Sequence, residues 1–493
     1  MTPFASQIDY TFRPRDISKI DNTLRNGRDA IVIAAPLSGL SAYLMQLRKH
    51  IQQAEHYSQA ISLLIDFDKH KTILRRDNNL PINFINIVFD SLGDFESSFK
   101  SKGSRLAELF DVFLENHTGL RLIIVIDNLQ TLSDQQIKDF LEEIRVISEE
   151  RKNQENLKRV QFVLGAQSIN LSKLDPKHSS PFNIAEKVWL DDFLPTESKE
   201  MISYLLSISR LPISYLIYEY VDFLTGGHPY LINHLCTQLI NVQNALGTSP
   251  KKITFKLIDH IISTICNDGQ DKLFRKLSSD ITNLQTDSVE VLKEILSGLR
   301  FDGMKTSPQI DELKLCGIIT NSRRDIWHVR NYFFEVYLRK NFQAFTNLNN
   351  VISRRLFIND IGYKMLFDLE NDLRDFIMAK MTSLYSSDWE ARIDINISSR
   401  WGNLRTAEIN SGWVSGEEFP KIAYSLFTDL RKVIDSNWST IFHEYFKPRD
   451  VFIGYFGNLE MLRNKIAHNR SLSDQDIEKL ETIADSFREC MYE

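Results

Sequence analysis

Three residues near the carboxyl end of the chain have types and a spacing that suit chemistry on a phosphodiester. They lie in the segment EMLRNKIAHNR, where Arg463 and Asn464 precede His468. Histidine titrates near neutral pH and can take a proton from a hydroxyl group. Arginine keeps its charge and binds phosphate oxygens in pairs. This set could cleave RNA without a metal ion. The alternative is that Arg463 and His468 only cap and solvate the end of a helix.

The spacing of these residues along a helix constrains the geometry of the site. Asn464 and His468 are four residues apart and share one helix face, so the amide can position the imidazole or the RNA. Arg463 precedes His468 by five residues, so on a regular helix the two side chains point in different directions around the axis. One chain is therefore expected to form half of a site.

A second candidate site lies in IVIAAPLSGLSAYL, residues 31–44. A short apolar strand, a tight turn and an apolar helix give it the outline of the phosphate-binding loop G-x-x-x-x-G-K-[ST]. Gly39 and Ser41 match this pattern, but Ala34 replaces the first glycine and Leu40 replaces the lysine. A strand–turn–helix crossover without a ligand would explain the same segment.

An acidic residue further along the chain supports the nucleotide interpretation. Asp127 ends the apolar run RLIIVID, and in P-loop proteins such an aspartate holds Mg²⁺ directly or through water. Asn128 follows where an acid that polarises the attacking water is expected. The N–H groups of residues 37–41 can still form an anion-binding nest. We therefore expect ATP or ADP with Mg²⁺ to be held weakly and without turnover, or the site to be empty.

Alternating strands and helices are predicted to position this loop. Helical patterns such as residues 41–53 and 134–150 separate short apolar runs, and this rhythm indicates a parallel α/β sheet with crossover helices. Strands are predicted at residues 29–35, 61–67, 121–127, 159–168 and 187–193.

The segment DFLTGGHPYLINHLCTQLI, residues 222–240, makes the comparison more specific. LTGGHPYL, with the strand series and the helices that follow, resembles the AAA-like, STAND-class ATPases of prokaryotes over residues 10–345. The resemblance implies a helical lid whose G-x-P motif, here Gly227 to Pro229, touches the adenine. Glycine also ends helices and proline suits a first helical turn, and both interpretations can hold together.

The region that follows has the element order of a winged helix: two helices, two short strands and a closing helix over residues 288–342. The resemblance implies that such a module follows the lid and carries a histidine that contacts the bound diphosphate. His328 is the candidate, and a plain surface histidine on a strand is the alternative. Arg323 and Arg324 would lie in the wing, where they could contact DNA or simply be solvated.

The final part of the chain is helical and shows no parallel-sheet pattern. Ser473 and Asp476 predict a capping-box start for its last helix. RNKIAH and its aromatic-rich lead-in resemble the HEPN family, a helical bundle in which R-x4–6-H motifs form a metal-independent ribonuclease site across a dimer. The resemblance implies catalytic roles for Arg463, Asn464 and His468. Helices are predicted at residues 363–384, 417–436, 439–446, 449–468 and 474–492.

Bulk properties limit the class of protein. A chain of 493 residues is too long for one compact core. Its net charge of −6 argues against a polybasic binder of nucleic acid or membranes. The 4 cysteines are scattered, which fits a reducing cytoplasm and offers no metal site. No segment approaches the roughly 20 apolar residues of a membrane helix, and the first residues do not resemble a signal peptide.

We therefore expect a multidomain protein: an α/β P-loop parallel sheet with a helical lid, a winged helix and a C-terminal all-α HEPN bundle. The expected boundaries are residues 1–194 for the P-loop NTPase-like core, 195–270 for the lid, 271–350 for the winged helix and 354–493 for the bundle.

The expected function is that of a cytoplasmic HEPN effector. It would be a metal-independent endoribonuclease, controlled by a nucleotide switch or scaffold, in prokaryotic antiphage defence or a toxin-like system. Its expected partners are substrate RNA and further copies of the chain joined through the HEPN domain. A separate sensor, either a protein or an RNA, is also expected because no sensor repeats are visible, and no membrane contact is expected. The alternative is a non-catalytic nucleic-acid-binding scaffold or regulator, with a degenerate ATPase and a HEPN assembly module.

Overall fold

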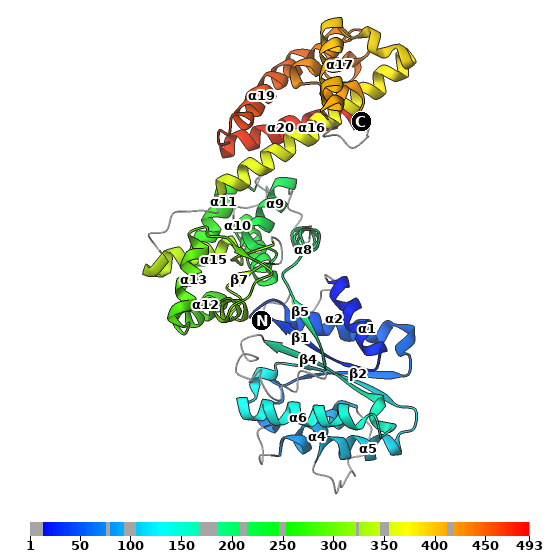
Figure 1. Ribbon diagram of the computed structural model, residues 1–493, viewed down its shortest axis with the longest axis vertical. Helices are drawn as coiled ribbons and strands as arrows, with labels where there is room; N and C mark the ends of the chain where they lie inside the picture. Colours follow the sequence, from blue (N-terminus) through cyan, green and yellow to red (C-terminus); the bar gives the residue numbers. More distant parts are fainter. Residues whose placement is uncertain are drawn as a thin grey trace. The chain divides into compact units, whose positions relative to one another are not determined.

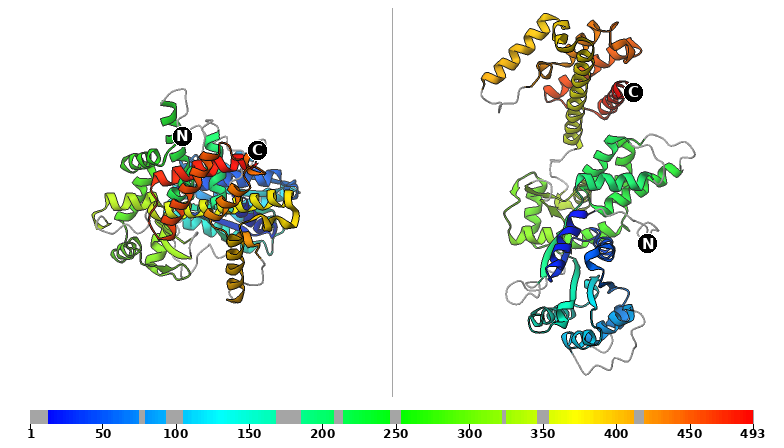
Figure 2. Two further views of the ribbon diagram at one scale, coloured as in Figure 1. Left: turned by 90° about the horizontal axis from the view of Figure 1, so that it is seen from above. Right: turned by 90° about the vertical axis from the view of Figure 1, so that its right-hand side faces the viewer.

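The chain folds into two compact units, Met1–Val351 and Ile352–Glu493. Figures 1 and 2 show both units from three directions. The wing arginines Arg323 and Arg324 lie outside the described residues. The computed structural model describes residues 13–74, 79–92, 105–167, 185–207, 214–245, 253–321, 325–345, 354–411 and 419–492.

A five-stranded sheet lies at the centre of the N-terminal half of the first unit (Figure 1). Its strand order is β2-β3-β4-β1-β5, and every neighbouring pair is parallel. The predicted parallel sheet is therefore confirmed, with β3 at its predicted ends and the ends of the other strands shifted by a few residues. The strands are β1 (Asp29–Ala34), β2 (Ala60–Asp66), β3 (Arg121–Asp127), β4 (Val160–Gln167) and β5 (Ala185–Leu190).

Helices cover both faces of this sheet and form a separate core on each (Figure 1). α1 (Pro14–Arg25) and α2 (Leu40–Gln53) lie on one face. The opposite face is covered by α4 (Leu80–Leu92), α5 (Leu106–Asn116) and α6 (Asp134–Glu150). The short elements of this part are η2 (Glu55–Tyr57), α3 (Lys71–Leu74), η3 (Leu129–Thr131) and η4 (Asn156–Arg159).

The central strand β3 shows why its sequence lacks alternation. Ile123 and Val125 belong to the core under α1 and α2, whereas Leu122, Ile124 and Ile126 belong to the core under α4, α5 and α6. A strand that is buried on both faces needs apolar residues at every position. The carboxyl ends of β1 and β3 emerge at one edge of the parallel sheet, where ligands of such folds usually bind.

Helices and a small antiparallel sheet complete the first unit. Two helices, two short strands and a closing helix follow one another as predicted for the winged helix: α13, α14, β7, β8 and α15. The additional short strand β6 joins β7 and β8 in a sheet with the order β6-β8-β7. The first group of helices is α8 (Pro195–Ser207), α9 (Tyr215–Thr225), α10 (Pro229–Ala245) and α11 (Phe255–Asn267). The remaining elements are α12 (Lys272–Thr282), α13 (Thr286–Leu296), β6 (Phe301–Asp302), α14 (Pro308–Leu315), β7 (Ile319–Thr320), β8 (Ile326–Val329), α15 (Tyr332–Asn341) and η6 (Gln343–Phe345).

The second unit is helical throughout its described residues, as the sequence predicts (Figure 2). Its long helix α16 packs against α18, α19 and α20. The elements are α16 (Arg354–Tyr385), η7 (Ser386–Arg392), α17 (Ile395–Asn410), η8 (Lys421–Tyr424), α18 (Phe427–Ser436), η9 (Phe442–Glu444), α19 (Arg449–Ala467) and α20 (Asp474–Tyr492).

The helix predicted at residues 363–384 is the longer α16, two further helix predictions differ from the structure, and one helix was not predicted. The segment 439–446 forms only the short 3-10 turn η9, although Phe442 and Phe446 are fully buried at a helical spacing. The helix predicted from residue 417 begins at Phe427, after a turn at Pro420. α17 was not predicted, because Ile397 and Trp401 are its only buried residues and give no periodic pattern. Among the described residues, no helix is long and apolar enough to cross a membrane.

Candidate functional sites

The loop between β1 and α2 has the backbone shape of an anion-binding turn. Leu37 and Gly39 adopt left-handed conformations, with φ of 58° and 83°, and Gly39 caps the start of α2. Such a conformation favours glycine at position 39 and is unusual for Leu37. The N–H group of Ser38 donates within the loop to the carbonyl of Ala35 at 3.2 Å. The first turn of α2 supplies N–H groups that have no partner inside the helix.

Ser41 and Asp127, which were predicted to act together, lie next to each other in the fold. Burial raises the pKa of the Asp127 carboxyl above its usual range, although a hydrogen bond with Ser41 opposes this effect. Asp66 is the register partner of Asp127 at the end of β2. The side-chain amide of Asn128 donates to Asp66 Oδ1 at 2.8 Å. A second carboxyl therefore lies beside Asp127 on the neighbouring strand, where it accepts from the Asn128 amide, and position 128 itself carries no acid.

Asp66 was not predicted as a site residue, although the sequence carries a signal for it. Asp66 ends the run ISLLID in the same way that Asp127 ends RLIIVID. Parallel strands that both end in an acid present two carboxylates at one sheet edge.

The GGHP segment, residues 226–229, joins α9 to α10 and packs against this loop. Gly226 ends α9 in a left-handed conformation with φ of 59°, and Pro229 is the first residue of α10. The predicted helix stop and start are therefore both present. A Cβ placed on Gly39 would lie 3.6 Å from Pro229 Cβ, so the proline packs directly on the loop. The backbone N–H of Phe193 also donates to the carbonyl of Gly227 at 2.9 Å.

Two buried arginines contact the loop, and neither was predicted from the sequence. Arg330 Nη2 donates to Ser38 Oγ at 2.6 Å, and the same guanidinium forms a two-point ion pair with Asp192, each contact 2.7 Å. Arg13 Nη2 donates to the Ser38 carbonyl at 3.1 Å, and its guanidinium lies 4.5 Å from the centre of the Phe193 ring. The loop without a lysine is therefore flanked by two cations that come from elsewhere in the chain.

His328, which was predicted to contact a diphosphate, is two residues from Arg330 in the sequence. His328 Nδ1 lies 2.8 Å from the carbonyl of Val329, its neighbour on β8. Arg330, two residues on, is the side chain of this segment that reaches the loop. The assignment of His328 as a nucleotide ligand remains a prediction.

His228, the middle residue of the G-x-P motif, is fully buried beside the loop. Neither ring nitrogen has a hydrogen-bond partner among the residues that the structure describes. Burial, together with the charge of Arg330, lowers the pKa of His228 to about 3, although Asp192 opposes the shift. The ring is therefore neutral near pH 7 and carries one donor and one acceptor that remain unsatisfied.

This histidine should make the first unit sensitive to acid. The unfolded chain takes up a proton at His228 as the pH falls below 6.5, the ordinary pKa, whereas the folded chain does not until about pH 3. Stability should therefore fall between pH 7 and pH 5, by roughly 2 kcal/mol from this residue. Urea unfolding of the wild-type chain and of His228→Gln at both pH values tests this. The prediction fails if the two chains lose the same stability on acidification.

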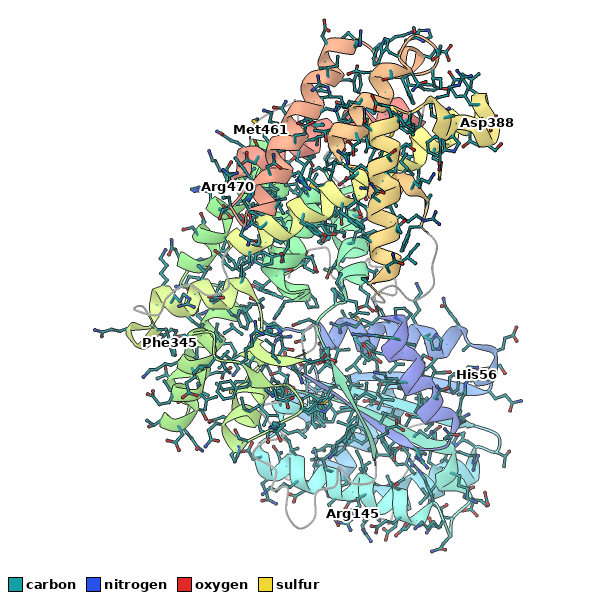
Figure 3. The ribbon with its side chains drawn as sticks, turned by 45° about the horizontal axis from the view of Figure 1, so that its top comes forward. His56, Arg145, Phe345, Asp388, Met461 and Arg470 are labelled. Carbon is teal, nitrogen blue, oxygen red and sulfur yellow. The ribbon has the colours of Figure 1, made fainter. Side chains whose placement is uncertain are left out.

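The residues of the RNKIAH motif lie at the exposed carboxyl end of α19. Arg463, Asn464 and His468 are all exposed, and Arg463 Nη1 donates to Asn464 Oδ1 at 3.2 Å. His468 is the C-cap, and its backbone N–H donates to the Asn464 carbonyl at 3.2 Å. Figure 3 labels Met461 and Arg470, which flank the motif on this part of the chain. The motif is therefore open to a large ligand or to a second protein copy.

Neighbouring elements hold this end of α19 in place. Leu459 and Leu462 are buried in the bundle, and Lys465 forms an ion pair with Asp476 at 2.8 Å. Asp476 also accepts a hydrogen bond from the backbone of Ser473 at 2.8 Å, as the predicted capping box requires. The buried face of α19 thus fixes the helix while its polar residues remain exposed.

A half-buried carboxyl on α16, that of Glu370, lies within the electrostatic reach of the motif. Burial raises the pKa of Glu370, although the charges of Arg374 and Arg463 oppose this shift. Glu370 also forms an ion pair with Arg374 at 2.7 Å. Arg463 therefore has a negative neighbour inside the unit, which can orient its side chain.

Comparison with known families agrees with both halves of this description. The family model of the AAA-like domain matches residues 92–297, and that of the Swt1-like HEPN domain matches residues 364–489. The fold and these matches therefore define a multidomain protein that joins an AAA-like P-loop domain to a helical C-terminal domain. Its C-terminal domain is a HEPN domain of the Swt1-like kind. The predicted fusion of these two domains is confirmed.

Solved structures with a similar fold are distant in sequence. The Walker-type ATPase PABY2304 of Pyrococcus abyssi is 15% identical, and the match covers 66% of this chain and 95% of that one with a TM-score of 0.43. The ORC2 protein of Aeropyrum pernix, in ADPNP and ADP complexes, is 12% identical, with 67% and 94% covered and a TM-score of 0.39. The RuvB Holliday junction branch migration motor of Thermotoga maritima is 14% identical, with 64% and 90% covered and a TM-score of 0.33. No curated protein shows significant similarity to the chain.

Proposed function

We propose that the HEPN domain is a metal-independent endoribonuclease that the AAA-like unit controls. The observation that carries this proposal is the exposed cluster of Arg463, Asn464 and His468 at the end of α19 in a Swt1-like HEPN domain. A role in prokaryotic antiphage defence, or in a toxin-like system, fits an RNA-cutting domain placed under the control of a nucleotide-binding domain.

The reaction assigned to the motif is transfer of the phosphodiester to the neighbouring hydroxyl. His468 takes the proton of the 2′-hydroxyl, and the 2′-oxygen attacks phosphorus while the bond to the 5′-oxygen breaks. The leaving 5′-oxygen gains a proton from water, and a 2′,3′-cyclic phosphate remains. Arg463 stabilises the negative charge that develops on the phosphate oxygens, and no metal ion is required.

A direct test is incubation of the purified chain with total RNA, with and without EDTA. Cleavage that persists in EDTA and is absent from His468→Ala supports the nuclease. Intact RNA bound by both chains would instead support the rival function, a non-catalytic scaffold or regulator that binds nucleic acid through its winged helix or its HEPN module.

The role proposed for the loop is to hold an adenine nucleotide without turning it over. Gly39 and the start of α2 would contact the phosphates, Ser41 and Asp127 would support Mg²⁺, and Gly227 and Pro229 would face the base. Asn128 provides no acid for the attacking water, and Leu40 provides no charge for the transition state. Bound nucleotide would then set the assembly state of the HEPN domain, with a separate sensor protein as the trigger.

Phosphate release should therefore be as slow in the wild-type chain as in a Ser41→Ala, Asp127→Ala double variant. The missing lysine contact alone is worth about 3 kcal/mol of transition-state stabilisation. The two measurements are phosphate release from ATP and the nucleotide content of the denatured protein. Wild-type turnover well above that of the double variant would contradict the prediction.

A further inference from the structure

The loop that lacks a lysine lies against a cation supplied by a distant segment. Arg330 follows β8 and is only 6% exposed, yet its Nη2 is 2.6 Å from Ser38 Oγ, inside the loop. Leu40, the residue at the lysine position, lies two residues after Ser38. The arginine therefore reaches the same turn that a lysine at position 40 would serve.

We propose that Arg330 is the phosphate-binding cation of this site and replaces the missing loop lysine, so that the loop takes a nucleoside diphosphate or triphosphate. The inference rests on the nucleotide binding proposed above and adds the residue that makes it possible. It concerns binding and not hydrolysis, because position 128 still carries an amide in place of an acid.

The hydrogen bonds of Arg330 leave one donor group for a ligand. Nε and Nη2 contact Asp192, and Nη2 also contacts Ser38. Nη1 makes no hydrogen bond within the part of the chain that the structure describes. Asp192 thus fixes the plane of the guanidinium, and Nη1 remains free to donate to a phosphate oxygen.

The neighbouring backbone is shaped to hold Arg330 at this place. Gly317 has a φ of 69°, and a Cβ on it would lie 3.0 Å from Arg330 Nη1 and 2.7 Å from Ala35 Cβ. A Cβ on Gly226 would lie 2.8 Å from the carbonyl of Arg330. Two glycines with left-handed conformations therefore let the segment around Arg330 approach both the loop and the end of α9.

A second observation is an unsatisfied polar side chain beside the same loop. His228 is fully buried, and its two ring nitrogens have no partner among the described residues. Leaving such groups unsatisfied costs free energy, so a polar ligand that pairs with them is favoured. The residue after it, Pro229, packs on Gly39 of the same loop. A nucleotide would satisfy the ring through its base and Arg330 Nη1 through its phosphates.

The ion pair between Arg330 and Asp192 allows a matched test. Asp192→Asn keeps the cation and an acceptor oxygen beside it, but leaves the buried charge of Arg330 without its counter-ion. The double variant Arg330→Gln, Asp192→Asn replaces the ion pair by two amides, so no buried charge is left unpaired. Both chains, and the wild type, would be titrated calorimetrically with ATP, ADP and AMP, and their folding would be checked by circular dichroism.

The expected results separate a phosphate-binding role from a structural one. Asp192→Asn should bind ADP and ATP as tightly as the wild type or more tightly. The double variant should lose about ten- to a hundredfold in affinity for both, since one charged hydrogen bond is removed, and much less for AMP. Equal affinity of the double variant and Asp192→Asn for ADP would overturn the inference. If the wild type binds neither ADP nor ATP, the proposed nucleotide site itself fails.

Discussion

Replacement of His468 by alanine is expected to lower EDTA-resistant RNA cleavage by about 10²- to 10⁴-fold, the usual contribution of a general base. The imidazole is exposed at the C-cap of α19, and its contact with the helix is made by the backbone N–H. Loss of the side chain should therefore change the free energy of unfolding by less than about 0.5 kcal/mol. Gel analysis of labelled RNA, together with thermal unfolding of each chain, measures both effects.

Arg463→Ala should give a loss of similar size by a different route. Its guanidinium is exposed and donates only to the neighbouring Asn464 within the described structure, so it is available to a phosphate. Arg449→Ala is the matched control for charge, because Arg449 is the first residue of the same helix and lies at its opposite end. His443→Ala is the corresponding control for an imidazole elsewhere in the unit. Wild-type cleavage by either motif variant would show that the active-site assignment is wrong.

Mixing the two inactive variants, Arg463→Ala and His468→Ala, is expected to restore cleavage. Five residues on an α-helix correspond to a rotation of about 140°, so one α19 presents Arg463 and His468 in different directions. A site that takes its arginine from one copy and its histidine from the other would resolve this geometry. Random exchange should then return about a quarter of the wild-type activity, because half of the symmetric dimers are mixed and each has one intact site.

The mixing experiment requires a measured assembly state. Light scattering on the full chain should show a dimer or larger oligomer at micromolar concentration, and each variant alone should remain inactive at the same total concentration. No recovery of activity from a mixture whose subunits demonstrably exchange would mean that each chain holds its own site. A monomer that cleaves RNA at a rate proportional to its concentration would lead to the same conclusion.

The sequence by itself determined those elements whose burial pattern, helix cap or motif can be recognised from neighbouring residues. β3 was predicted with its observed ends because burial on both faces demands an unbroken apolar run. α6 coincides with its prediction, and Ser133 and Gln136 form a capping box at its start. The RNKIAH motif was found because its residues are near neighbours on one helix. In all these cases the deciding interactions lie within a few residues along the chain.

The surroundings of the loop could be decided only by the tertiary structure. Arg330 and Ser38 are separated by 292 positions, and Arg330 and Asp192 by 138. A lone arginine, aspartate or histidine carries no local pattern, so no spacing rule connects Arg330 with a loop that lacks its lysine. α17 was missed for a related reason, since its two buried side chains are too few to produce a helical period. Packing of distant segments brings these charges together. An unpaired buried charge would cost several kcal/mol, so each buried charge is paired even when its partner is far away in the sequence.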